Sequence, residues 1–188
     1  MSKIFIVNGH EYYDFSPGRL NSTMIQKMIQ EFKKHNHEIK TTIVQEGYNI
    51  KEEQEKFNWA DVIIYQSPVH SFNLPLLFLK YFSELLKHFV TLDTEYGHGG
   101  LLQGKKYMFS LTMNAPEYSF GNKEKFFDGK SIDDLFFHVH KLQQFTGMTP
   151  LPTFALYDVM HNPDIDVYLS KLQKHLQQTF TLSEIQNI

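Results

Sequence analysis

The 188-residue sequence contains no cysteine. Disulfide bonds, thiol nucleophiles and thiolate metal sites are therefore excluded for this chain. Although it has ten histidines, they form no H-E-x-x-H motif or similar cluster, so we expect no metal site. A G-x-S-x-G motif is also missing, which argues against a serine hydrolase of the α/β-hydrolase type.

Long hydrophobic runs are absent as well. No apolar stretch approaches the roughly 20 residues that a membrane helix requires. Asn8 interrupts the N-terminal apolar run too early for a signal peptide. The formal net charge is −3, and both signs are spread along the chain, so no basic surface for nucleic acid is indicated. We expect a cytoplasmic protein that neither enters a membrane nor binds nucleic acid.

What the sequence does contain is a regular alternation of apolar strand-like runs and amphipathic helix-like segments. Strands are predicted at 4–7, 38–44, 61–68, 106–112 and 153–157. Helices are predicted at 21–35, 48–58, 74–89, 131–145 and 164–179. Asn21 or Ser22 is the expected N-cap of the first helix, and Ser131 begins the fourth. We expect one domain over residues 1–180 and a polar C-terminal tail over 181–188.

This alternation places the chain in the α/β class. It predicts a three-layer sandwich, in which helices cover both faces of a five-stranded parallel sheet. Five strands fit the flavodoxin-like order 2-1-3-4-5. In such a sheet, ligands bind at the carboxyl ends of the strands, so the loops at 8–23, 67–73 and 112–120 are expected to meet at one crevice.

The first of these loops has the composition of an anion-binding loop. Gly9 and Gly18 let the backbone approach a ligand closely. The remaining candidates can donate hydrogen bonds beside the N–H groups of the helix start: Ser16, Asn21, Ser22 and Thr23. The pattern is neither a G-x-G-x-x-G nor a Walker lysine motif. A phosphate site and an ordinary loop before a capped helix both remain open.

The other two loops could hold a flat ring. His70 and Phe72 could line an aromatic ligand, or they could be an exposed histidine and a core phenylalanine. Thr112, Met113, Asn114 and Ala115 could present backbone N–H groups to a ring edge, although Asn114 could equally complete a turn. The aromatic content of 15%, with 17 Phe and 10 Tyr, suits an aromatic core, a stacking pocket or a subunit interface.

With these segments in place, the sequence resembles the flavodoxin-like NAD(P)H:quinone oxidoreductases of the modulator of drug activity B group. The matching segments cover nearly the whole chain: Ile6-Val7-Asn8-Gly9, Ser16 with Gly18-Arg19-Leu20-Asn21, Trp59-Ala60-Asp61-Val62-Ile63-Ile64, Tyr96 with Gly99-Gly100-Leu101, Gln103-Gly104-Lys105-Lys106-Tyr107-Met108, Ser110-Leu111-Thr112, Asn114-Ala115-Pro116, Phe126-Phe127-Asp128-Gly129, and Gly147-Met148 with Pro150-Leu151-Pro152-Thr153-Phe154.

The resemblance implies a dimeric enzyme that binds FAD, rather than FMN, and reduces a quinone or another small aromatic acceptor with NAD(P)H. By position, the residues implied to hold the cofactor phosphates are Ser16, Gly18, Leu20, Asn21 and Thr23. Those implied to frame the isoalloxazine are Pro68, Val69, His70, Ser71, Thr112, Met113, Asn114 and Ala115. Tyr96 is implied to contact the flavin from the loop after the third helix. The site is expected at the interface of a homodimer.

The implied reaction is a two-electron hydride transfer from NAD(P)H via FAD to the acceptor. His70 or Tyr118 could donate a proton to the quinone oxygen. This chain departs from close relatives in two features. It has Val69-His70-Ser71 where the relatives have Gly-Trp-Trp, and its segment after Phe89 is shorter than theirs. Two other classes stay open: a flavin-binding electron carrier or regulatory accessory subunit without NAD(P)H turnover, and a flavin-free interaction domain.

Overall fold

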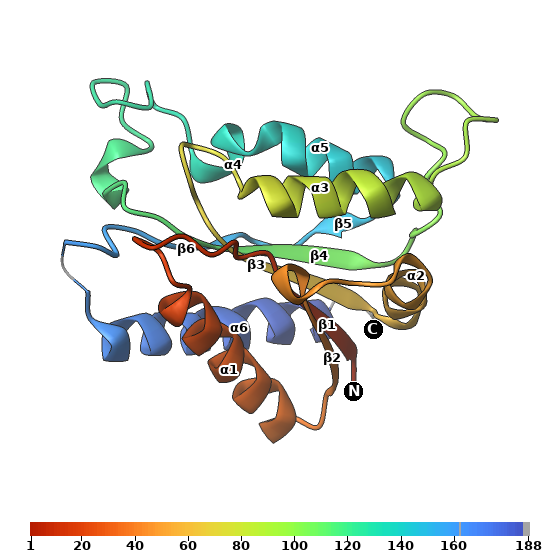
Figure 1. Ribbon diagram of the computed structural model, residues 1–188, viewed down its shortest axis with the longest axis horizontal. Coiled ribbons are helices and arrows are strands. Elements are labelled where there is room, and N and C mark those ends of the chain that lie inside the picture. The colour runs from red at the N-terminus through yellow and green to blue at the C-terminus, as the bar shows by residue number, and fades with distance from the viewer. Residues whose placement is uncertain (162, 186–188) are drawn as a thin grey trace.

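The computed structural model describes residues 1–161 and 163–185. Its strands all run parallel in one sheet (Figure 1). They are β1 (Lys3–Asn8), β2 (Glu38–Ile43), β3 (Val62–Pro68), β4 (Lys106–Thr112), β5 (Thr149–Pro150) and β6 (Phe154–Leu156). The order across the sheet is β2-β1-β3-β4-β5, and β6 also pairs with β4.

The fifth position of the sheet is therefore shared by two short strands. β5 pairs with the beginning of β4 at Lys106 and Tyr107, and β6 pairs with its end from Ser110 to Thr112. Pro150 ends β5 and Pro152 lies within the break, and proline cannot donate to a ladder of hydrogen bonds. The predicted order 2-1-3-4-5 is confirmed, with the fifth strand divided in two.

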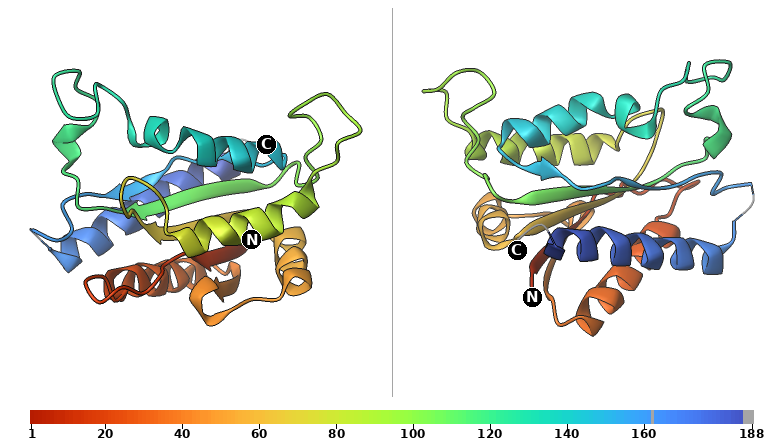
Figure 2. Two further views of the ribbon diagram at one scale, coloured as in Figure 1. Left: turned by 45° about the horizontal axis from the view of Figure 1, so that its top comes forward. Right: turned by 180° about the vertical axis from the view of Figure 1, so that it is seen from behind.

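Helices cover both faces of this sheet (Figure 1, Figure 2). On one face lie α1 (Arg19–Lys34) and α6 (Ile165–Ile185). On the other lie α2 (Ile50–Trp59), α3 (Leu76–Leu85), α4 (Ile132–Leu135) and α5 (Phe137–Phe145). Short 3₁₀ turns follow at Val44–Glu46, Leu86–Phe89 and Glu117–Ser119. Within the described residues, no helix combines the length and the apolar character of a membrane span.

Each face has its own hydrophobic core. Met24 and Met28 of α1 pack with Leu172 of α6 under one side of the sheet. Phe57, Phe78 and the α5 residue Val139 belong to the larger core on the other side. Much of the high aromatic content lies in this second core, because most of its largest fully buried side chains are phenylalanine or tyrosine.

Several helix boundaries differ from the sequence-based prediction, most of all in the last two predicted helices. The helix predicted at 131–145 is divided at Phe136, whose backbone leaves the helical conformation with φ −99° and ψ 19°. Ser131 does begin it, through a reciprocal capping box with Asp134. The final helix continues to Ile185. The rest of the expected C-terminal tail, residues 186–188, lies outside the described part of the chain.

The start of α1 also differs from the prediction, and this difference affects the site. The helix begins at Arg19, so Asn21 and Ser22 are helical residues and neither is the N-cap. Gly18 holds that position in the left-handed conformation, with φ 82° and ψ 13°. Glycine alone reaches this region without a steric cost, and it has no side chain that could cap the helix.

Candidate active site

A pocket of about 650 Å³ lies at the carboxyl end of the sheet. This volume falls within the usual range of ligand sites, about 300–1,000 Å³. The three loops predicted to meet there do so, and the loop after β6 joins them. The lining residues are His10, Asp14, Phe15, Ser16, Pro17, Gly18, Arg19, Leu20, Asn21, Pro68, Val69, His70, Ser71, Thr112, Met113, Asn114, Val159 and Met160.

One end of the pocket suits an anion. It contains the start of α1, where the first backbone N–H groups of a helix have no partner within the helix. The first turn of α1 holds Arg19 and uncharged residues, whereas the first turns of α2 and α4 hold pairs of carboxylates. The positive end of the α1 dipole is therefore left for a ligand such as a phosphate. Asp14 and Arg19 contribute charges of opposite sign to the lining.

Four of the six residues expected at the phosphate end line this pocket: Ser16, Gly18, Leu20 and Asn21. The other two, Ser22 and Thr23, are not among its lining residues, because the helix begins earlier than predicted and turns them away. Ser22 is exposed, and the Thr23 hydroxyl donates to the carbonyl of Arg19 at 2.9 Å. Their predicted contact with the cofactor has no counterpart in the lining of this pocket.

The side chain of Asn21 belongs to a buried hydrogen-bond network. Its amide Nδ2 donates to Asn8 Oδ1 at 2.6 Å, and its Oδ1 accepts from Gln66 Nε2 at 3.0 Å. Gln66 in turn accepts from the Ser110 hydroxyl at 2.7 Å, and Asn8 Oδ1 also accepts the His10 backbone N–H. The network links α1 to β1, β3 and β4 beneath the pocket. It therefore helps to hold in position the loops that follow these strands.

The other end of the pocket is formed by the loops after β3 and β4. Val69 donates its backbone N–H to the carbonyl of Thr112 at 2.8 Å, which joins the two loops. Pro68, His70 and Met113 also line this end. Of the residues expected to frame a ring, Ala115 alone lines a neighbouring small cavity instead.

His70 occupies a tight turn in this wall. Its backbone pairs with that of Asn73 through hydrogen bonds of 2.8 and 2.9 Å. Among the described residues, the buried Nδ1 atom of His70 has no hydrogen-bond partner. Burial lowers the pKa of His70 and the nearby His10 adds to this effect, while Glu11 opposes it. The ring is therefore held in its neutral form, with Tyr13 packed edge-on at 5.0 Å between ring centroids.

The two tyrosines expected at the site lie elsewhere within a single chain. Tyr96 is 89% exposed in the loop before β4, which emerges at the amino end of the sheet, and its ring contacts Phe145. Figures 1 and 2 show this loop at the opposite end of the molecule from the 117–130 segment. Tyr118 lines an adjacent pocket with Tyr157 and Lys171. The expected contact of Tyr96 with a flavin therefore does not form inside one chain.

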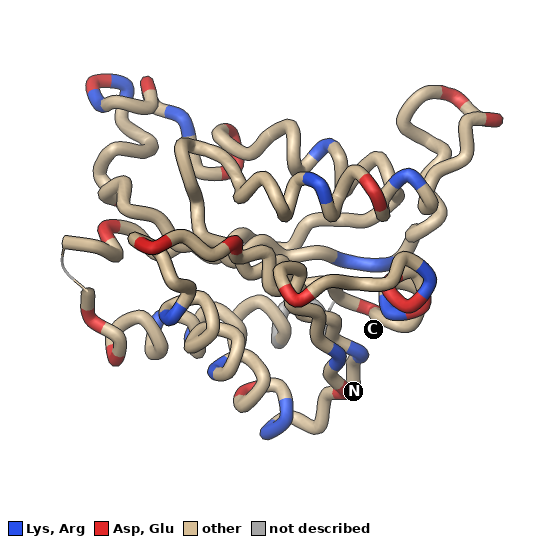
Figure 3. The backbone as a smooth tube through the Cα atoms, in the orientation of Figure 1, with Lys and Arg blue, Asp and Glu red and all other residues tan. Residues whose placement is uncertain are grey.

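The described residues contain no group of three or more metal-ligating side chains. Charged residues of both signs are dispersed along the described backbone, as the tube in Figure 3 shows. These observations leave the pocket at the carboxyl end of the sheet as the strongest candidate for chemistry.

Some lining residues were missed by the sequence-based prediction. Val159 and Met160 follow β6, and the carboxyl end of this strand meets the same edge as those of β1, β3 and β4. The signal was available, since the fifth predicted strand also ends at that edge. Phe15 and Arg19 also line the pocket but were not among the residues expected at the anion site.

Comparison with known proteins agrees with this geometry. The family model described as flavodoxin-like fold matches residues 2–179. The NADPH:quinone oxidoreductase MdaB of Haemophilus influenzae is 39% identical, over 94% of this chain and 98% of that protein. The chain belongs to the flavodoxin-like family of NAD(P)H:quinone oxidoreductases.

Solved structures of lower sequence identity share the fold of this family member. A putative quinone reductase from Klebsiella pneumoniae has a TM-score of 0.78 at 19% identity, covering 94% of this chain and 84% of that one. General stress protein 14 of Treponema denticola, solved in complex with FMN, has a TM-score of 0.66 at 13% identity, covering 98% and 99%. The family and the fold predicted from the sequence are both confirmed.

Proposed function

We propose that this protein is a flavin-dependent NAD(P)H:quinone oxidoreductase whose cofactor is FAD. The observation that carries the proposal is the pocket that joins an anion-binding helix start to the loops after β3 and β4. A flavin nucleotide needs both ends, because its phosphates are anionic and its ring is flat and largely apolar. The 39% identical relative, which is named as an NADPH:quinone oxidoreductase, supports the same reaction.

The residues of the pocket fit such a cofactor. The start of α1 and Ser16 would hold the phosphates, since they offer hydrogen-bond donors and the positive end of a helix dipole. Gly18 at the start of this helix leaves no room for a side chain, because a Cβ there would lie 2.6 Å from the His10 ring. Pro68, Val69 and the Thr112–Asn114 segment would frame the ring.

When bound, the flavin supplies two-electron transfer from NAD(P)H to a quinone or similar acceptor. The protein's part is to bind, orient and shield the reactants. The neutral His70 ring forms part of the wall, and it is the better placed of the two candidate proton donors, because Tyr118 lines a different pocket. Donation from His70 would use the protonated ring, because a neutral imidazole that gave up a proton would become an imidazolate, and the lowered pKa of His70 makes the protonated form the minor one at neutral pH.

The experiment begins with the visible absorbance of the purified protein. We expect the absorbance band of an oxidised flavin, and release by heat followed by chromatography should identify FAD. Anaerobic addition of NADPH should bleach the band, and a quinone should restore it. A protein that is colourless and cannot be reconstituted with either flavin would overturn the proposal. A flavin that NAD(P)H does not bleach would instead favour the electron-carrier alternative.

The state of His70 gives a prediction about pH. The folded chain resists protonation of His70, while the unfolded chain accepts a proton near the ordinary pKa of 6.5. Stability should therefore fall as the pH drops below that value, and this group should contribute nothing above it. Urea denaturation at about pH 7.5 and about pH 5.5 measures the change. The H70Q variant should lose less stability on acidification than the wild type, and an equal loss would contradict the prediction.

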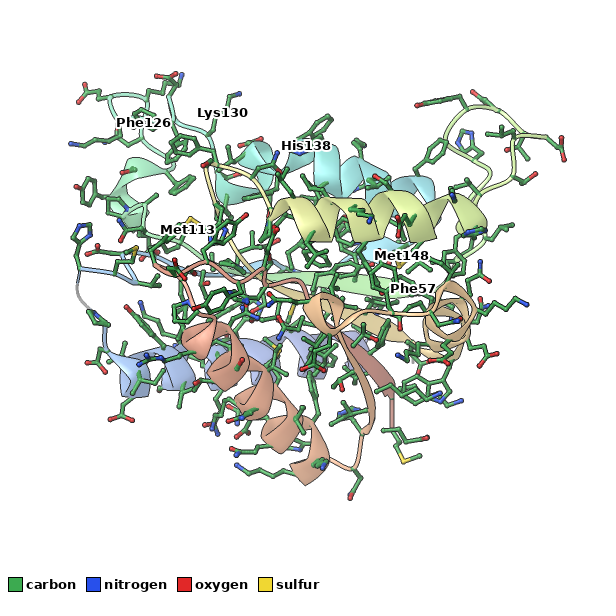
Figure 4. All side chains as sticks on the ribbon, in the orientation of Figure 1. Phe57, Met113, Phe126, Lys130, His138 and Met148 are labelled. Atoms are coloured by element: carbon green, nitrogen blue, oxygen red, sulfur yellow. The ribbon has the colours of Figure 1, made fainter. Side chains whose placement is uncertain are left out.

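We also propose that the protein is a homodimer with the pocket at the subunit interface. Several large apolar side chains are exposed on or above the α3–α5 layer, including Leu76, Tyr96, Phe126 and Phe137. The 91–100 loop and the 117–130 segment rise above this layer at opposite ends of the molecule (Figure 1, Figure 4). A twofold pairing of these layers would carry the 91–100 loop of one copy to the pocket end of the other.

This arrangement predicts the effect of removing the Tyr96 ring. Y96A should still be dimeric by light scattering but should lose flavin more readily on dilution, by about tenfold in dissociation constant. Y12A is a matched control, because Tyr12 is also exposed but lies outside the α3–α5 layer and the pocket lining. A monomeric wild type, or equal flavin retention in Y96A and Y12A, would overturn the proposed arrangement.

A further inference from the structure

A second pocket, of about 560 Å³, lies beside the candidate active site and shares none of its lining residues. Its walls come from the turn at Glu117–Ser119, from the end of β6 and from α6. Figures 1 and 2 show this turn and the start of α6 at the same end of the molecule. The volume is that of a ligand site, and the proposed flavin site does not account for it.

Two chain segments line both pockets and so connect them. The segment that follows β4 lines the candidate active site with Thr112–Asn114 and the second pocket with Pro116–Tyr118. The segment that follows β6 also lines both pockets, and its Asp158 donates a backbone N–H to the Ala115 carbonyl at 3.3 Å. A long ligand that leaves the active site across these paired segments therefore reaches the second pocket.

Tyrosine rings dominate the walls of the second pocket. Tyr118, Tyr157 and Tyr168 all line it, and Tyr168 is only 7% exposed. Burial raises the pKa of Tyr157, with further contributions from Glu117 and Asp133, so its hydroxyl stays protonated and can donate a hydrogen bond. Such rings offer a face for stacking and a polar edge, which suits a flat heterocycle such as a purine.

Lys171 of α6 brings a cation to this pocket that the protein does not neutralise. Among the described residues, its ammonium group has no ion-pair or hydrogen-bond partner. Asp158 also lines the pocket, but its carboxylate already bonds His161 Nδ1 at 2.9 Å. Glu117 is exposed, and its carboxylate can accept hydrogen bonds from ribose hydroxyls. Aromatic faces, an unpaired ammonium group and a hydroxyl acceptor together suit an adenosine phosphate.

We infer that the second pocket binds the adenosine half of the nicotinamide nucleotide, with its purine against the tyrosine rings and a phosphate on Lys171. This inference rests on the proposed function. A nicotinamide that reaches a flavin in the active site carries its purine at the far end of a pyrophosphate bridge. Because the flavin occupies the active-site pocket, that purine needs a site outside it, and the second pocket is the neighbour with the matching chemistry.

The test reverses the charge of Lys171 in the flavin-loaded protein. K171E should raise the KM for the nucleotide donor by about tenfold, the effect of losing one charge-assisted hydrogen bond, and leave kcat unchanged. K171R should restore the KM. K174E is the matched control, because Lys174 is exposed on the same helix but does not line the pocket. An effect confined to NADPH would place Lys171 at the 2′-phosphate, and an equal effect with NADH would place it at the pyrophosphate; both support the inference.

A second readout needs no turnover. Calorimetry with adenosine 2′,5′-bisphosphate, which carries a phosphate at either candidate position, should show binding to wild type and K174E that is about tenfold weaker in K171E. Equal KM values in K171E and K174E, or no binding of the bisphosphate to a protein that the donors reduce, would overturn the inference and leave the proposed function standing. Loss of flavin in K171E would also overturn it, since the pocket would then belong to the flavin. A flavin that neither donor bleaches would overturn the proposed function itself.

Discussion

Replacing Asn21 with aspartate is expected to lower the free energy of unfolding by about 3 kcal/mol. The Asn21 amide is only 3% exposed, and its Nδ2 donates to Asn8 Oδ1 at 2.6 Å. In N21D one carboxylate oxygen would keep the Gln66 Nε2 donor, but the other would face the Asn8 Oδ1 acceptor without a donor, and the buried charge would be only partly satisfied. Urea denaturation at neutral pH measures the loss.

The pH dependence of this loss identifies its cause. Burial should raise the pKa of the new carboxyl above that of the unfolded chain, so the penalty is fully present well above the ordinary pKa of about 4 and shrinks as the pH falls toward it. The difference between N21D and wild type should therefore be smaller at about pH 4.5 than at about pH 7. A difference that does not change with pH would point to lost packing instead.

Ser22 provides the matched control for charge near the cofactor. It lies in the same turn of α1 but is exposed, so S22D should change stability by no more than about 0.5 kcal/mol. It nevertheless brings a negative charge to the phosphate end of the pocket and should weaken flavin retention. Loss of flavin in S22D with full stability would separate the electrostatic role of this helix start from the structural role of Asn21.

The buried network around Asn21 shows where reasoning from the sequence reaches its limit. Asn21 was predicted to bind phosphate because a polar residue at a helix start often does so. Gln66 and Ser110 lie within apolar strands, and the sequence alone gives no indication that Gln66 meets Asn21 or that Ser110 meets Gln66. Such pairings connect residues far apart in the chain, and only the register of β1, β3 and β4 brings them together.

The fold itself was predictable because each strand carries a strong local signal. Ile4–Val7, Val62–Tyr65 and Tyr107–Phe109 are nearly continuous apolar runs, which are typical of strands covered on both faces. Once five such runs alternate with helices, the handedness of the crossovers leaves few arrangements. The convergence of the loops follows from the sheet, since the carboxyl ends of parallel strands share one edge.

Local backbone geometry was harder to predict. The divided helix at Phe136 and the divided fifth strand depend on packing and on prolines at strand ends, which periodicity does not show. Tyr96 lies away from the pocket of its own chain, so its contact with a flavin stays a prediction that depends on the proposed dimer. Because the left-handed Gly18 is the N-cap, α1 begins at Arg19, earlier than predicted, and Ser22 and Thr23 do not line the pocket.

Replacing Gly18 with alanine is expected to destabilise the protein by about 3 kcal/mol and to abolish flavin retention. Two costs combine at this position. The left-handed backbone, with φ 82°, disfavours any Cβ by about 1–2 kcal/mol. The added methyl group would also lie 2.6 to 2.9 Å from three atoms of the His10 ring, which is itself buried. The ring would have to move, and with it the contact of its Nε2 with the Ser16 carbonyl at 2.9 Å.

Two other glycines separate these costs. Gly104 has φ 81° in a turn closed by the Lys105 N–H and the Leu102 carbonyl, and no atom lies within 4 Å of the place where an alanine methyl group would stand. G104A should therefore show the backbone cost alone, about 1 kcal/mol, and keep its flavin. In G9A the methyl group would overlap the buried Phe78 ring, so overpacking of about 1–3 kcal/mol is expected there. If G18A loses no more stability than G104A and retains flavin, the His10–Ser16 contact does not shape the phosphate end of the pocket. If G18A refolds normally but binds no flavin, the close approach of the backbone at Gly18 is what the cofactor requires.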